Sequence, residues 1–240
     1  MAAVRNIAHR GASGEHPENT LAAFRAAIGE GADCCELDVQ CSADGVLVVV
    51  HDDRIDRTTD GAGSVARLTL AQLKALDAGR WRDARFAGER IPSLEEVCKA
   101  VAGKCALNVE LKAAGIEAQV CDLVRGAAPS SILSSFDWAA LARVRQMAPE
   151  LGVGLLASRG RARLLDSAVE LRALAVHPRY DLVDASFCAD AHRRGLLVYV
   201  WTVDEVATMA RLIAAGVDGI MTNYPARLRA LLQDGAVQSE

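Results

Sequence analysis

Residues 4–31, VRNIAHRGASGEHPENTLAAFRAAIGEG, contain a short apolar run, a polar loop and an amphipathic segment, in that order. The first five residues have the length and composition of a buried strand. The amphipathic segment places Leu21, Phe24 and Ile28 on one helix face, and Asn19 is the expected N-cap. The stretch therefore predicts one strand–loop–helix unit.

The same unit recurs along the chain. Each of the first seven expected strands is followed by a plausible helix, and strands joined by helical crossovers run parallel. A closed (β/α)8 TIM barrel matches both the number of units and the length of 240 residues. We expect its strands at 4–8, 33–40, 105–110, 131–134, 152–156, 173–176, 196–200 and 218–221.

A doubly wound open sheet is the main rival architecture. Its dinucleotide-binding version carries GxGxxG after the first strand, and this chain does not have that motif there. Helix signals support the unit pattern: Ser93 and Glu96 form a capping box, a later helix is expected from Asp204 to Gly216, and Pro225 suits a first helical turn.

One segment interrupts the alternation. About fifty residues, roughly 42–92, separate the second expected strand from the helix that begins SLEEV. We expect an extra strand at 46–50 and a short helix at 69–76. The insertion, about 52–90, is too small for a separate domain, so we predict a single domain over 1–240.

Composition narrows the functional class. The chain is 51% hydrophobic and 24% charged, with a net charge of -4. It has no basic run, so we expect no nucleic-acid partner. The apolar runs are strand-length, far short of the ~20 residues of a membrane span, and no signal peptide is recognisable. These features predict a cytoplasmic protein without stable membrane insertion. The seven cysteines lack CxxC spacing and are expected to be free thiols.

Polar side chains collect where strands end, and the active sites of such barrels lie at the carboxyl ends of their strands. His9 and Arg10 follow the first strand, and His51 follows the inserted one. Glu36 and Asp38 are two residues apart on the second strand, so both side chains leave the same face.

The third barrel strand repeats this spacing with Glu110 and Lys112. Inward-facing carboxylates on neighbouring strands are costly unless they are paired or bind a metal. Three carboxylates suit one hard divalent cation, Mg²⁺ or Ca²⁺. Cations beside a metal site point to an anionic substrate, and phosphate is the natural candidate. As an alternative, Glu36 and Asp38 could lie on an ordinary exposed strand face, and Glu110 and Lys112 could form a cross-strand ladder of charges on the surface.

Several motifs together resemble the glycerophosphodiester phosphodiesterase family. In order along the chain they are HRG and PENT, ELDVQCSADGVLVVVHD, IPSLEEV, LNVELK, WTVD and DGIMTNYP. The resemblance extends from His9 to Pro225. One departure is that many relatives have WTVN where this chain has WTVD, and we expect Asp204 to cap the following helix with little catalytic effect.

The resemblance implies a (β/α)8 barrel, a divalent metal, and hydrolysis of glycerophosphodiesters to sn-glycerol 3-phosphate and an alcohol. It implies that His9 and His51 are the general acid and base. The metal ligands would be Glu36, Asp38 and Glu110, and the substrate would contact Arg10, Lys112, Trp201 and Phe136. The aromatic residues have a second interpretation, as packing at the top of the barrel.

Two other functions remain open on the sequence. A phospholipase-like phosphodiesterase would act on intact lipid or lysolipid, and would need an apolar rim. The polar insertion DRTTDGAGSV instead favours a small, deacylated substrate. A barrel that binds phosphodiesters without cleaving them would lack at least one key residue, and all five are present: His9, Glu36, Asp38, His51 and Glu110.

Overall fold

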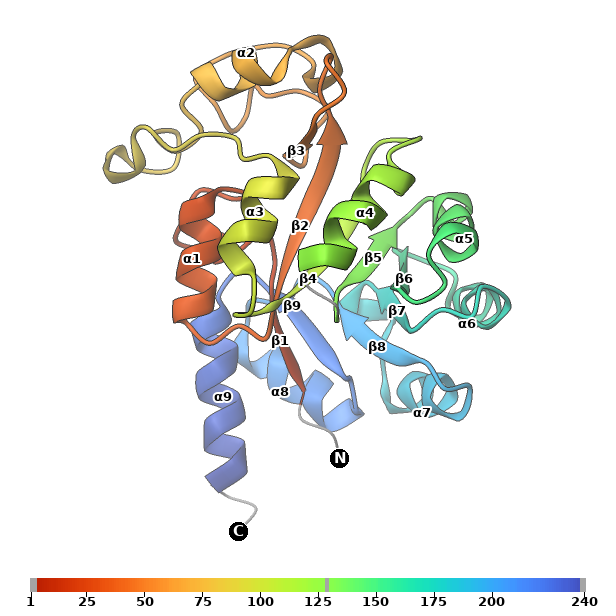
Figure 1. Ribbon diagram of the computed structural model, residues 1–240. Coiled ribbons are helices and arrows are strands. Elements are labelled where there is room, and N and C mark those ends of the chain that lie inside the picture. The colour runs from red at the N-terminus through yellow and green to blue at the C-terminus, as the bar shows by residue number, and fades with distance from the viewer. Residues whose placement is uncertain (1–3, 128–129, 238–240) are drawn as a thin grey trace.

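Eight parallel strands close into a barrel in the computed structural model, which describes residues 4–127 and 130–237 (Figure 1). Strand β1 pairs with both β2 and β9, and this double pairing closes the barrel and excludes the open sheet. The barrel strands are β1 (Arg5–Ala8), β2 (Cys34–Cys41), β4 (Ala106–Leu111), β5 (Ile132–Ser135), β6 (Gly152–Ala157), β7 (Ala175–Pro178), β8 (Leu197–Val200) and β9 (Gly219–Thr222). All eight predicted strands are confirmed, with ends that move by a few residues.

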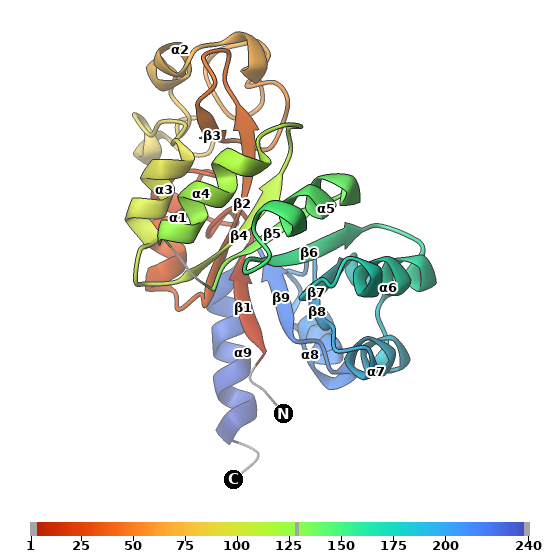
Figure 2. The same ribbon diagram turned by 45° about the vertical axis from the view of Figure 1, so that its right-hand side comes forward.

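Helices surround the barrel and bury its outer face (Figure 2). Except for α2, which lies in the insertion, each covers the strand layer because a parallel sheet needs apolar cover on its outer side. The helices are α1 (Leu21–Gly29), α2 (Leu70–Ala75), α3 (Leu94–Val101), α4 (Glu117–Ala127), α5 (Trp138–Met147), α6 (Arg161–Glu170), α7 (Ala185–Arg193), α8 (Val206–Ala215) and α9 (Pro225–Val237). Short 3₁₀ turns occur at Val65–Arg67, Ala84–Phe86 and Tyr180–Leu182.

The helix-end signals were correct at three places and wrong at two. Ser93 and Glu96 form the predicted capping box, Gly216 ends α8 with φ 92°, and Pro225 begins α9. The predicted N-cap Asn19 is wrong, because Thr20 caps α1 by accepting a hydrogen bond from the Ala23 amide. Asp204 does not cap α8 either: the N-cap is Glu205, which makes no side-chain capping bond.

The segment between β2 and α3 packs against the outgoing end of β2, at the top of Figure 1. Its strand β3 (Leu47–Val49) runs antiparallel to β2, with Val49 opposite Val39. The predicted extra strand and short helix are confirmed as β3 and α2. The segment has a small core of its own, formed by Val48, Val50, Ile55, Val65, Leu73, Ala78 and Ile91.

The barrel interior changes from apolar to polar along the barrel axis. Its lower part is filled by an apolar cluster that includes Ile7, Ile132 and Tyr199. His177 on β7 is fully buried above this layer, and Gly154 on β6 makes room for its ring, since a Cβ there would lie 2.4 Å from the imidazole. The charged side chains of Arg10, Glu36 and Lys112 gather around a cavity toward the carboxyl ends of the strands.

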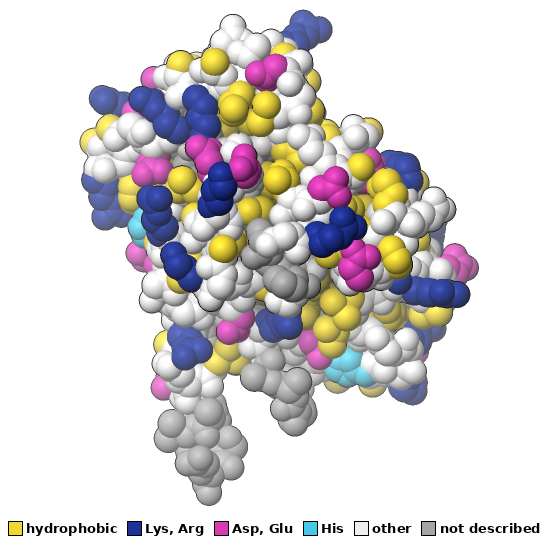
Figure 3. Space-filling view, in the orientation of Figure 1, with side chains coloured by type: hydrophobic (Ala, Val, Ile, Leu, Met, Phe, Trp, Pro, Cys, Tyr) yellow, Lys and Arg dark blue, Asp and Glu magenta, His cyan; other side chains and the backbone are white. Residues whose placement is uncertain are grey.

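Charges of both signs are interspersed on the face drawn in Figure 3, where basic side chains also gather at the upper left, over the insertion. Among residues 4–127 and 130–237, none of the helices has the length and apolar character that crossing a bilayer requires.

Candidate functional site

Three carboxylates meet at the carboxyl end of the barrel. Glu36 and Asp38 project inward from β2 because side chains two residues apart share a strand face, and Glu110 on β4 stands directly opposite Asp38 in the register. Their side-chain oxygens lie within 4.8 Å of one another. All three residues are more than nine-tenths buried. The spacing that predicted a cluster is thus realised across two neighbouring strands.

Two cations lie against this cluster. Lys112 Nζ is 2.7 Å from Glu110 Oε1 and 3.3 Å from Asp38 Oδ1. Arg10 Nε is 3.2 Å from Asp38 Oδ2, and the Arg10 backbone N–H donates to Glu36 Oε2 at 2.8 Å. Asp38 is therefore the carboxylate with the most positive surroundings.

The pKa values of the three carboxyls diverge for that reason. Burial alone would raise the pKa of Asp38, but Arg10 and Lys112 hold it below its ordinary value. Burial and the nearby charges of Asp38 and Glu110 raise the pKa of Glu36 well above its ordinary value. Burial and Asp38 raise the pKa of Glu110 to about 7. With all three ionised, the cluster carries one negative charge more than its two cations offset, and three close carboxylate groups are a donor set that fits a hard divalent cation.

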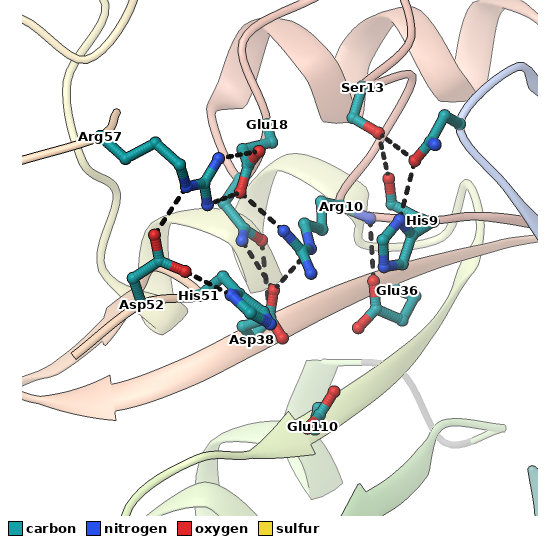
Figure 4. Close-up of polar contacts among 12 residues, drawn as sticks. His9, Arg10, Ser13, Glu18, Glu36, Asp38, His51, Asp52, Arg57 and Glu110 are labelled. Atoms are coloured by element: carbon teal, nitrogen blue, oxygen red, sulfur yellow. Dashed lines mark hydrogen bonds and ion pairs between the residues drawn. The ribbon is translucent and has the colours of Figure 1, made fainter. Parts of the chain in front are cut away.

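His9 is held by a hydrogen-bonded chain that begins two strands away in the fold. Its Nδ1 lies 2.8 Å from Asn223 Oδ1, and Ser13 Oγ lies 2.8 Å from the same oxygen (Figure 4). Asn223 Nδ2 donates to Asp204 Oδ2 at 2.7 Å. Because that amide nitrogen is engaged, the oxygen faces His9, so Nδ1 carries the proton and Nε2 has the free lone pair. Burial and the charge of Arg10 lower the pKa of His9 to about 4.

Asp204 therefore has a different role from the one expected. Besides the Asn223 side chain, it accepts from the Asn223 backbone N–H at 2.8 Å and from Thr222 Oγ1 at 3.0 Å. These three bonds tie the loop after β8 to the end of β9 and fix the amide that faces His9. The predicted helix cap is wrong because these long-range donors occupy both carboxylate oxygens.

His51 is held by an anion instead of an amide. Its Nδ1 lies 2.6 Å from Asp52 Oδ1, and Arg57 Nε donates to Asp52 Oδ2 at 2.6 Å. Both terminal nitrogens of Arg57 donate to the Glu18 carboxylate, at 2.7 and 2.8 Å. Figure 4 shows this chain of contacts, which runs from His51 through Asp52 and Arg57 to Glu18.

Glu18 closes the chain by accepting from Arg10 Nη1 at 2.8 Å. Sequence reasoning missed Arg57. No motif marks it, because its partner Glu18 lies 39 residues away and the insertion alone brings the two together.

The backbone of the first loop is shaped around these contacts. Arg10 and Asn19 both have left-handed backbones, with φ of 56° and 57°. Asn19 Nδ2 donates to Asp38 Oδ2 at 2.9 Å, which explains why Asn19 does not serve as the N-cap. Gly11, at φ 78°, packs so closely on α1 that a Cβ would lie 2.6 Å from the Ala23 carbonyl carbon. Unusual conformations of this kind persist where the surroundings over-determine them.

Two aromatic residues form the apolar side of the site. Phe136 and Trp201 meet edge to face with ring centroids 5.6 Å apart, and Trp201 Nε1 donates to the His177 carbonyl at 2.7 Å. Both line a cavity of about 120 Å³ at the end of the barrel. The other predicted site residues that line it are His9, Arg10, Glu36, His51, Glu110 and Lys112. Asp38 lies just behind the lining, within the carboxylate cluster.

The chain is similar to known proteins in sequence and in fold. The model of the glycerophosphoryl diester phosphodiesterase family matches residues 9–227. A glycerophosphodiester phosphodiesterase of Caldanaerobacter subterraneus subsp. tengcongensis is 42% identical over 95% of this chain and 98% of its own. The structure of an Oleispira antarctica phosphodiesterase in complex with the product sn-glycerol-3-phosphate is 31% identical, with a TM-score of 0.90 over 96% of this chain and 97% of the other.

The chain belongs to the glycerophosphoryl diester phosphodiesterase family. A second solved structure, a glycerophosphodiester phosphodiesterase from Agrobacterium tumefaciens, has a TM-score of 0.85 and 30% identity over 95% of this chain and 99% of its own. The family inferred from the motifs is thus confirmed, together with its barrel and its class of enzyme, a phosphoric diester hydrolase.

Membership in the glycerophosphoryl diester phosphodiesterase family leaves the individual roles to be argued from geometry. The nine residues predicted for the site converge on one end of the barrel, from strands and loops as far apart in sequence as His9 and Trp201. Three further residues, Arg57, Asp204 and Asn223, hold them in place.

Proposed function

We propose that the protein hydrolyses glycerophosphodiesters to sn-glycerol 3-phosphate and an alcohol, with one divalent cation and a pair of histidines. The observation that carries this proposal is that His9 and His51 line the same cavity as the carboxylate cluster while each has its Nδ1 engaged. Each imidazole therefore has Nε2 left for a substrate. Two such groups around one anion site are what phosphodiester hydrolysis requires, because one proton must be removed and another supplied.

Glu36, Asp38 and Glu110 would hold the cation, Mg²⁺ or Ca²⁺. Bound there, it would supply positive charge for the non-bridging phosphate oxygens and for the charge that develops on them in the transition state. Arg10 and Lys112 lie on the cavity wall and bind the same oxygens, so the phosphate is drawn between fixed positive charges. Phe136 and Trp201 pack against the glycerol carbons.

The partners of the two histidines assign their roles. His9 faces a neutral amide oxygen and keeps a lone pair on Nε2, so it takes the proton from the attacking hydroxyl, which belongs to water or to the glycerol 2-OH. His51 faces the Asp52 carboxylate, which stabilises an imidazolium, so it gives its proton to the departing alcohol. A new P–O bond forms as the P–O bond to the alcohol breaks. Where the 2-OH attacks, water then opens the cyclic phosphate.

The test measures glycerol 3-phosphate released from a panel of glycerophosphodiesters by protein stripped of metal and then supplied with Mg²⁺ or Ca²⁺. We expect release only with metal, and a loss of about 10²–10⁴-fold in kcat for His9→Ala or His51→Ala. His192→Ala is the matched control, since His192 is exposed and pairs with Asp218, outside the cavity. Near-normal turnover by the His9→Ala/His51→Ala protein would refute the assignment.

A phospholipase-like activity on intact lipid or lysolipid is the alternative. The small volume of the cavity, about 120 Å³, and its charged lining favour a deacylated, small-molecule substrate. Assaying a lysophospholipid beside its deacylated form separates the two, and faster cleavage of the lipid would replace our proposal with the alternative.

A further inference from the structure

A second and larger cavity adjoins the site. It has a volume of about 550 Å³, against about 120 Å³ for the site itself. Phe136 and Leu156 line both cavities, so the two are neighbours across a shared wall. The larger one lies where β5 and β6 lead into α5 and α6, a region visible at the right of Figure 2.

The other side of the site offers much less room. Toward the insertion, the cavity lined by Glu18 and His51 measures about 10 Å³, and the ion pairs of Arg57 cross that side. A phosphodiester bound between Arg10 and Lys112 has two arms, and the small cavity suits only the glycerol arm. The space past Phe136 is therefore where the second arm, the alcohol, has room.

The larger cavity is positively charged. Arg159 and Arg163 line it, both are exposed, and none of its lining residues is acidic. Within the described parts of the chain, neither guanidinium has a carboxylate within ion-pair distance, whereas Arg161 between them is held by Asp184 at 2.8 Å. Two guanidinium groups without carboxylate partners present donor forks that match a carboxylate or a phosphate.

The aromatic side chains that line the larger cavity do not turn this preference for anions into one for ammonium groups. Quaternary ammonium groups bind proteins by stacking on aromatic faces. The ring of Trp138, which lines the cavity, already has the Arg163 guanidinium 5.7 Å from its centroid. A choline or ethanolamine group would meet that cation at the same ring.

We propose that the larger cavity is the subsite for the alcohol and that it favours alcohols bearing a carboxylate or phosphate over alcohols bearing only an ammonium group. The inference rests on the proposed function. Arg159 and Arg163 act on binding of the alcohol arm, and the reacting phosphate remains with Arg10 and Lys112.

Glycerophosphoserine and glycerophosphoethanolamine form a matched pair, because they differ by one carboxylate. We expect kcat/KM for the serine diester to exceed that for the ethanolamine diester by about five- to tenfold at low salt, as two exposed ion pairs allow. The ratio should fall toward one in the Arg159→Gln/Arg163→Gln protein, and also at high ionic strength. Arg161→Gln is the control and should keep the wild-type ratio.

The outcomes separate the two proposals. Equal kcat/KM for both diesters, with no change in the double variant, would overturn the alcohol subsite and leave the hydrolysis standing. A double variant that lowers the rate on both diesters equally would also overturn it. No glycerol 3-phosphate from either diester, with metal present, would refute the proposed function itself.

Discussion

Replacing Asp204 with Asn tests whether the amide of Asn223 sets the proton position on His9. The change is isosteric, but it replaces one accepting oxygen with an NH₂ donor. The Oδ1 position is fixed by two donors, the Asn223 backbone N–H and Thr222 Oγ1. The new NH₂ group therefore takes the Oδ2 position and faces Asn223 Nδ2, which lies 2.7 Å from that oxygen in the wild type.

Two donors cannot share that contact, so the Asn223 amide turns and presents Nδ2 to His9. His9 Nδ1 must then accept, which moves the ring proton to Nε2 and removes the lone pair that acts as the base in the proposed mechanism. Restoring the productive arrangement costs a hydrogen bond to a charged group, about 1.5–3 kcal/mol. We therefore expect kcat to fall about 10- to 100-fold.

The decisive variant is the swap Asp204→Asn/Asn223→Asp. Its carboxylate at 223 accepts from both His9 Nδ1 and the amide at 204, so kcat should return to within about threefold of wild type. The assay is glycerol 3-phosphate release, accompanied by thermal unfolding and by ¹⁵N NMR of the His9 ring. The spectrum should report Nδ1–H in the wild type and the swap, and Nε2–H in Asp204→Asn. A single variant within twofold of wild type, or a swap no faster than the single variant, would refute the reasoning.

Three further outcomes follow from the geometry. Glu110→Gln removes one of the three proposed anionic ligands and should weaken Mg²⁺ or Ca²⁺ binding about tenfold or more by calorimetric titration, a readout independent of turnover; an unchanged titration would remove Glu110 from the proposed ligand set. Burial lowers the pKa of His177 from 6.5 to about 3. Below pH 6.5 the imidazole is therefore protonated in the unfolded chain but stays neutral in the folded one, and the free energy of unfolding falls as the pH drops. In denaturant unfolding, the stability lost on lowering the pH from 7 to 5 should be about 2 kcal/mol smaller in His177→Asn than in the wild type. Gly11→Ala should destabilise by about 1–3 kcal/mol more than Gly45→Ala, since both have positive φ but a Cβ at Gly45 meets open space; equal losses would show that strain at positive φ is the whole effect.

The predicted barrel rested on local signals that tertiary packing did not override. Short apolar runs, capping residues such as Ser93 and stop residues such as Gly216 lie within a few positions of the elements they define. Strand periodicity likewise put Glu36 and Asp38 on one face, and the parallel register then placed Glu110 beside them.

The two wrong helix caps, Asn19 and Asp204, have a common cause. Both are residue types that often cap helices. Here Asn19 is instead bonded to Asp38, and Asp204 to Asn223 and Thr222, all partners that the fold brings from elsewhere in the chain. The rule for helix caps considers only backbone donors a few residues away, whereas these two side chains bond to groups that are distant in sequence.

The sequence by itself determined the architecture, the family and the nine residues of the candidate site, because repeat spacing and motifs are properties of the chain. Only the tertiary structure decided how those residues are held: Arg57 reaching Glu18 across the insertion, the amide of Asn223 turned toward His9, and a cationic cavity beside Phe136. These contacts join segments 39 to more than 200 residues apart in sequence. Spacing along the chain does not contain that information. Asn223 meets His9 only because the barrel closes and brings the first and last strands together, and Arg57 meets Glu18 only because the insertion folds over the first loop.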